Sequence, residues 1–143
     1  MGVQQSIGPA ATNGPYERTV WSMTSGRDLN RSVAKGFGAT LILTGIAGFV
    51  IPVKKSVTSG APAYNVFHLV FGAIGILASR RRGTARAFNV GFGSIDLYQA
   101  VASRRGLFPQ KWFRWKPADD VLHVVVGAGL VAAGLRRRAA DSR

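Results

Sequence analysis

Cysteine is absent from this chain, and histidine and acidic residues are scarce: its 143 residues include two His and six Asp or Glu. Without cysteine the protein forms no disulfide and no thiolate site, so its cysteine content does not indicate an oxidising or a reducing compartment. The sequence also lacks an HExxH zinc motif, a phosphate-binding loop and a recognisable Ser/His/Asp spacing. Residues 1–30 lack the apolar core of a secretory signal. These absences predict a protein that is not an enzyme, has no metal site and needs no cofactor.

Positive charge, in contrast, is abundant. Nineteen Lys and Arg give a formal net charge of +13, although 47% of the residues are hydrophobic. In a soluble domain so basic a composition would indicate nucleic-acid binding. Here the charges stand in blocks between apolar runs, which is how membrane proteins place Lys and Arg in their loops. We therefore predict an integral membrane protein whose partner is the lipid bilayer, and no binding of nucleic acid.

Four apolar runs are long enough to cross a membrane as helices. Each has about 17–20 residues, close to the length that spans ~30 Å of hydrocarbon at 1.5 Å per residue. They cover residues 33–51, 62–79, 87–103 and 118–135. The predicted fold is an all-α membrane protein with four transmembrane helices in one bundle (33–135). A polar N-terminal tail (1–32) and a basic C-terminal tail (136–143) flank it.

The distribution of Lys and Arg predicts the orientation in the membrane. Twelve of them lie before or at the start of the first run, between the second and third, or after the fourth, whereas seven lie in the other two loops. Because Lys and Arg are enriched in cytoplasmic loops, both termini are predicted to be cytoplasmic.

A pattern of twelve residues occurs twice, fifty-five positions apart, at 62–73 and 117–128. Seven of the twelve positions are identical, and the two histidines, His68 and His123, occupy the same place in each copy. The first and third runs show a fainter likeness, between residues 35–38 and 86–89. The chain is therefore predicted to be two helical hairpins in the same orientation, a parallel repeat.

Small residues form stripes on three of the predicted helices. In the second helix His68, Gly72, Gly75 and Ser79 share a face at three- and four-residue spacing, and in the fourth His123, Gly127 and Gly134 do so. The first helix carries small or hydroxyl residues at every fourth position: Gly36, Thr40, Thr44 and Gly48. Because such stripes let helix backbones approach closely, both histidines are predicted to face the interior of the bundle.

Three polar residues are predicted to lie at one depth in the membrane. His68, His123 and Asp96 each fall about 8–10 Å below the outer boundary at 1.5 Å per residue. A buried carboxylate needs a partner, and a histidine ring N–H is the nearest candidate for Asp96. The first interpretation is a hydrogen-bonded polar layer that fixes helix register. The alternatives are ligation of a haem or chlorophyll-type pigment by His68, His123 or both, and a proton relay through the three residues.

The remaining polar and aromatic features have structural interpretations. Asn65, Asp119 and Asp120 stand near helix starts, where such residues cap the helix and favour its dipole. The loop between the third and fourth runs carries Trp112, Phe113 and Trp115 among basic residues. Aromatic rings with basic neighbours are typical of the headgroup level. We therefore predict interface anchors there, with a docking surface for a partner subunit as the alternative.

Short motifs in a fixed order resemble the bacterial domain-of-unknown-function family numbered 4383, whose members are small four-helix membrane proteins. The similar residues lie at 65–68 with Gly72, at 86–89 with Gly93 and at 120–123 with Gly127. Asp96 departs from the resemblance, because the family usually has an apolar or aromatic residue there. The resemblance implies a fold and a bacterial source, hence an inner-membrane location, but no activity.

The function expected from these observations is that of a non-enzymatic accessory or structural subunit of a larger bacterial inner-membrane complex. The expected partners are other membrane-protein subunits. The alternative is a subunit that binds haem or a chlorophyll-type pigment through His68 and His123 for electron transfer or light harvesting.

Overall fold

The computed structural model describes residues 28–52, 54–56, 58–107 and 110–136, and within them the chain is helical with no strand. The helices are α2 (Leu29–Val50), α3 (Pro62–Ala78), α4 (Arg82–Arg104), α5 (Gln110–Phe113) and α6 (Pro117–Leu135). Four long helices match the four predicted runs, and the one-turn helix α5 was not predicted. Most of the predicted N-terminal tail, and residues 137–143 of the C-terminal tail, lie outside the described residues.

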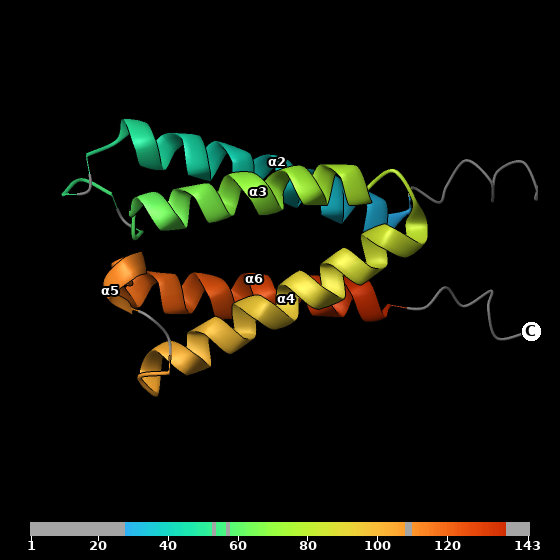
Figure 1. The fold of residues 1–143 in the computed structure, drawn as a ribbon. Helices are drawn as coiled ribbons and strands as arrows, with labels where there is room; N and C mark the ends of the chain where they lie inside the picture. Colours follow the sequence, from blue (N-terminus) through green and yellow to red (C-terminus); the bar gives the residue numbers. More distant parts are fainter. Residues whose placement is uncertain (1–27, 53, 57, 108–109, 137–143) are drawn as a thin grey trace, which may run out of the picture.

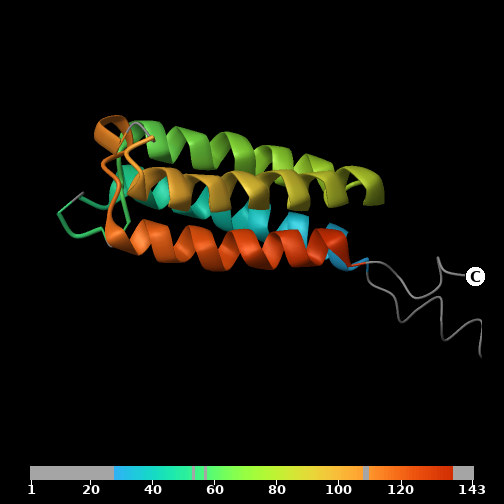
Figure 2. The same cartoon turned by 90° about the horizontal axis from the view of Figure 1, so that it is seen from below.

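The helices form two antiparallel hairpins, α2 with α3 and α4 with α6, which pack against each other (Figure 1). Asp28, the loop between α3 and α4, and Arg136 lie at one end of the bundle, which we call the tail end. The α2–α3 loop and α5 lie at the other, the loop end, in both views (Figures 1 and 2). This arrangement places the ends of the described chain together, as the predicted topology requires.

Local chemistry sets the helix starts. Asp28 is the N-cap of α2, and its side chain accepts a hydrogen bond from the Asn30 backbone N–H at 3.2 Å. Pro62 and Pro117 open α3 and α6 at the first helical position, where a missing N–H costs nothing. α2 and α4 begin earlier than predicted, at Leu29 and Arg82, because a helix continues through polar residues at the end of an apolar run.

Glycines bring the two helices of each hairpin into backbone contact. A Cβ added at Gly38 would lie 2.7 Å from the Gly72 carbonyl oxygen, and one at Gly72 would lie 2.7 Å from that of Gly38. Gly93 and Gly127 make the same reciprocal approach at 2.7 Å in the second hairpin. The predicted buried faces of the second and fourth helices are confirmed, since all their residues are buried: His68, Gly72, Gly75 and Ser79 in the first hairpin, and His123, Gly127 and Gly134 in the second. The stripe predicted for the first helix is wrong in part. Gly48 packs closely against the Asn65 side chain, but nothing lies near Gly36, and the contacts with the opposite backbone are made by Gly38 and Gly45.

Equivalent arginines tie the two ends of each hairpin together. The Arg31 Nε–H donates to the Ser79 carbonyl at 2.9 Å, and Arg86 donates in the same way to Gly134 at 2.9 Å. Each residue of the first hydrogen bond lies fifty-five positions before its counterpart in the second, as each glycine of the first hairpin does. The repeat therefore covers the whole hairpin at one spacing, so that residues 36–38 (Gly-Phe-Gly) correspond to residues 91–93 (Gly-Phe-Gly). The predicted match of 35–38 with 86–89 had the wrong register.

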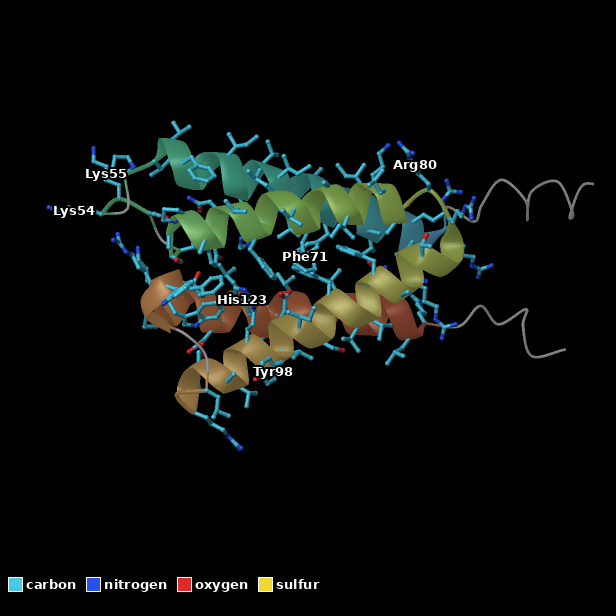
Figure 3. The ribbon with its side chains drawn as sticks, viewed as in Figure 1. Lys54, Lys55, Phe71, Arg80, Tyr98 and His123 are labelled. Carbon is cyan, nitrogen blue, oxygen red and sulfur yellow. The ribbon has the colours of Figure 1, made fainter. Side chains whose placement is uncertain are left out.

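The core between the hairpins is aromatic near its middle. Phe37 and Phe92, which occupy equivalent positions in the repeat, meet with ring centroids 5.7 Å apart. Phe71 lies 5.0 Å from Phe92, and Phe88 stacks on Phe92 at 5.5 Å. Phe71 points from α3 into the space between the hairpins (Figure 3). Hydrophobic contacts therefore join the two hairpins near the middle of the bundle, and the polar contacts between them lie closer to its ends.

Two described helices are long and apolar enough to cross a membrane: α2 and α6, each with a mean hydropathy of 1.6. α3 is apolar but has only 17 residues, and α4 is not among the candidate spans. The structure thus bears out an all-helical bundle with two helices able to cross a membrane.

Candidate functional site

A cavity of about 180 Å³ lies between the two hairpins, toward the loop end. All four long helices contribute to it, with Thr58 from the α2–α3 loop. Its lining includes His68, Asp96 and His123, the three residues predicted to lie at one depth. His123 points from α6 toward the opposite hairpin (Figure 3). The remaining lining residues are Phe37, Thr40, Leu41, Thr44, Thr58, Tyr64, Phe92, Leu122 and Val126.

The two histidines are held in the same way. His68 Nδ1 lies 2.7 Å from the Tyr64 carbonyl oxygen, and His123 Nδ1 lies 2.6 Å from that of Asp119. A carbonyl oxygen only accepts, so Nδ1 carries the proton and donates it. In the neutral ring Nε2 is then an acceptor with a free lone pair. No described residue hydrogen-bonds to either Nε2 atom.

Asp96 is 3% exposed, and no described residue hydrogen-bonds to its carboxylate. The prediction that a histidine N–H partners Asp96 is therefore wrong, because both Nδ1–H groups are used by backbone carbonyls. The cavity brings the three residues together without joining them. Among the described residues no group of three or more His, Asp or Glu could hold a metal ion.

Aromatic rings pack on both imidazoles. The Tyr64 ring lies 4.1 Å from that of His68 and 6.4 Å from that of His123, centroid to centroid. The Trp115 ring lies 4.5 Å from the His123 ring. These contacts fix the orientation of the rings, so the positions of the Nε2 atoms are set by packing as well as by the hydrogen bonds at Nδ1.

Asp119 joins the two hairpins at the loop end, close to the cavity. It is fully buried, and its Oδ1 accepts hydrogen bonds from the Tyr64 hydroxyl at 3.1 Å and the Ser59 N–H at 3.4 Å. Its Oδ2 accepts from the Lys116 N–H at 2.8 Å, the N-cap contact predicted for it. The Ser59 hydroxyl also donates to the Phe113 carbonyl. Asp119 is thus a helix cap and, beyond the prediction, the link between the two hairpins.

The other two predicted caps have different roles. The N-cap of α3 is Ala61, and Asn65 lies four residues into the helix, where its Nδ2 donates to the Gly60 carbonyl at 3.3 Å. Asp120 accepts from the Ser103 hydroxyl at 2.5 Å and the Trp115 Nε1–H at 2.7 Å. Capping is therefore wrong for Asn65 and Asp120, because both residues stand one position beyond the one that reaches back to the N-cap. Asp120 does lie in the first turn of α6, where a carboxylate favours the helix dipole as predicted.

The three predicted interface anchors are not equivalent. Trp112 is 77% exposed, in the position that an anchor would take. Trp115 is instead half-buried on His123, and Phe113 is half-buried with its carbonyl bound to Ser59. Anchoring at a membrane interface stays a prediction for Trp112.

Sequence reasoning missed Tyr64 and gave Thr40 and Thr44 only a packing role. Tyr64 links the cavity to Asp119, and the two threonines line the cavity. The available signal was the repeat itself: Tyr64 and Asp119 occupy equivalent positions and are unlike in size and charge. Here the two equivalent positions that differ in chemistry bond to each other and join the hairpins.

The fold and the site define a class: a small helical bundle built from a duplicated hairpin, with a cavity between the two copies that contains two histidines and an aspartate. Residues 31–136 match the family described as Domain of unknown function (DUF4383). The chain belongs to this family, as the resemblance of its short motifs predicted. Neither a curated protein nor a solved structure matches the chain.

Proposed function

We propose that this protein is a four-span integral membrane protein of the bacterial inner membrane that acts as a non-enzymatic accessory subunit of a larger complex. His68, His123 and Asp119 serve in this proposal to fix how the two hairpins pack. The observation that carries the proposal is the outward face of α4.

The outer surfaces of α2, α3 and α6 suit lipid, but that of the first half of α4 does not, although Ile95, Tyr98 and Val101 are exposed further along this helix. The first three expose large apolar side chains such as Leu43, Val70 and Val125. From Arg82 to Ser94, α4 exposes no large apolar side chain, and its outward residues include Ala87, Gly91 and Ser94. Small and hydroxyl residues on a membrane helix favour contact with another helix rather than with lipid.

A groove of about 700 Å³ runs beside this face, between the end of α3 and the start of α4. Ile74, Leu77 and Ala87 are among its lining residues, with Arg80 and Arg81 at its tail end. A helix lying on α4 would place its side chains in this groove. The same helix would shield α4, the most polar of the four, from lipid.

Two open glycines provide a matched test of docking. Gly91 on α4 and Gly129 on α6 are both exposed, and a Cβ added at either would meet nothing within 4 Å. Gly91→Leu and Gly129→Leu should therefore both fold. After purification in mild detergent, wild type and Gly129→Leu are expected to elute with other membrane subunits, and Gly91→Leu without them.

Two results would contradict the accessory role. One is a peak that contains this chain alone in the wild type. The other is a complex that Gly91→Leu leaves intact, which would place the partner on another face.

The pigment-binding alternative rests on the free Nε2 atoms of His68 and His123 in one cavity. With Nδ1 anchored to a backbone carbonyl, each imidazole is oriented as a ligand is in metal sites. The cavity of about 180 Å³ is below the ~300–1,000 Å³ of pockets for larger ligands, so a tetrapyrrole would require the hairpins to separate. An absorption spectrum of the same purified peak tests it: a visible band lost in His68→Leu or His123→Leu would favour this alternative.

A further inference from the structure

Three of the groups that line the cavity between the hairpins are hydrogen-bond acceptors. They are the Asp96 carboxylate and the Nε2 atoms of His68 and His123. No described residue donates to any of them. Two nearby hydroxyls are engaged elsewhere, since Tyr64 donates to Asp119 and Thr40 to the Gly36 carbonyl. A ligand complementary to this set must bring several N–H or O–H donors.

The charge of the cavity favours a cation. Asp96 is almost fully buried, and no Lys or Arg is among the residues that line the cavity with it. An ionised carboxylate in such surroundings is costly without a positive partner. The rings of Phe37, Phe92 and Tyr64 also line the cavity, and aromatic rings attract ammonium groups.

The internal repeat shows that the carboxylate is not needed for packing. The position equivalent to Asp96 in the first hairpin is Leu41, which lines the same cavity and is 5% exposed. The hairpin therefore accepts a leucine, which is branched like aspartate but apolar, at this place. Asp96 is thus the one polar residue that α4 contributes to the cavity, and the packing of the hairpins does not require it.

The size and opening of the cavity limit the ligand further. A volume of about 180 Å³ is several times the ~30 Å³ of one water molecule but below that of pockets for larger ligands. Thr40 on α2 and Leu122 on α6 line the cavity and are also exposed on the outer surface, so it opens between these helices. We propose that the cavity binds a small primary ammonium ion, with its N–H groups on Asp96 and the two imidazoles and its short carbon chain against the aromatic rings.

The test uses the purified full chain in detergent, with propylammonium as the probe and 1-propanol as its neutral analogue. Propylammonium is expected to raise the unfolding temperature saturably, and 1-propanol is not. Asp96→Leu, which copies Leu41, should weaken propylammonium binding at least tenfold. Tyr98→Leu, on the exposed side of α4, should leave it unchanged.

A second measurement covers the case in which Asp96→Leu does not fold. In the wild type, propylammonium is expected to shift the ring proton resonances of His68 and His123, and 1-propanol is not. Equal effects of the two probes, no saturable effect of either, or undiminished binding by Asp96→Leu would overturn the proposal. Because the test uses the isolated chain, its outcome is separate from that of the partner experiment.

Discussion

Asp119 accepts two hydrogen bonds from the opposite hairpin, more than any cavity residue described above. Its two oxygens accept three hydrogen bonds, from a side chain and a backbone group of the first hairpin and from its own N-cap. A buried carboxylate satisfied in this way is stable, but its donors lose their partner together if it is removed. The Tyr64 hydroxyl is the only side-chain donor among the three.

Replacing Asp119 with Ala should therefore destabilise the protein by about 3 kcal/mol, since three donors, two of them buried, would lose their acceptor. Tyr64→Phe removes one donor and should cost about 1 kcal/mol. Reversible unfolding by SDS in mixed micelles measures both. Ser94→Ala is the control, because the Ser94 hydroxyl is exposed and bonds only to its own helix. Equal stabilities of Asp119→Ala and the control would refute the role of Asp119 as the link.

At the scale of the helix, each hairpin depends on one reciprocal glycine contact. In both hairpins a Cβ added at the glycine would lie 2.7 Å from a backbone carbonyl oxygen of the opposite helix, which cannot rotate away. A methyl group at this point must push the two helices apart. The open glycines on the outer surface have no such constraint.

Gly72→Ala and Gly127→Ala should each lower the free energy of unfolding by about 1–3 kcal/mol through overpacking. Gly129→Ala meets nothing within 4 Å and should be neutral or raise it by up to about 1 kcal/mol, because Ala favours the helix. The unfolding midpoints of the three variants in one detergent give the comparison. A neutral Gly72→Ala would mean that the α2–α3 contact is looser than in the structure.

The repeated pattern and the apolar runs predicted the helices, their pairing and the buried position of His68 and His123. The errors are of two kinds. Some concern residues whose role depends on the position at which a helix begins, and others concern contacts between the two hairpins. Asn65 was predicted to be a cap from its chemistry, although Pro62 at the first helical position already sets the N-cap at Ala61. The link through Asp119 joins residues 59, 64 and 119, and no local pattern reveals so distant a contact.

At the scale of the whole molecule, the two hairpins have nearly the same backbone contacts. They differ in the side chains that line the cavity and in those on the outer surface. The first carries Leu41 at the cavity where the second carries Asp96. The outer faces of α2, α3 and α6 carry large apolar side chains, while α4 exposes none between Arg82 and Ser94. A duplicated hairpin thus gives a pseudo-symmetric frame with a buried carboxylate at the cavity on one side only and a distinct outer face on α4.

The central claim is that all four long helices cross the membrane, including α4. Because the chain has no cysteine, single cysteines can be placed at Lys55, Arg80 and Arg105, in the loop between α2 and α3, the loop between α3 and α4, and the turn after α4. Their labelling by a membrane-impermeant thiol reagent, before and after the membrane is opened, reports the side on which each lies. Four crossings predict Lys55→Cys and Arg105→Cys outside and Arg80→Cys in the cytoplasm. If all three label from the same side, only α2 and α6 cross the membrane and the account is contradicted.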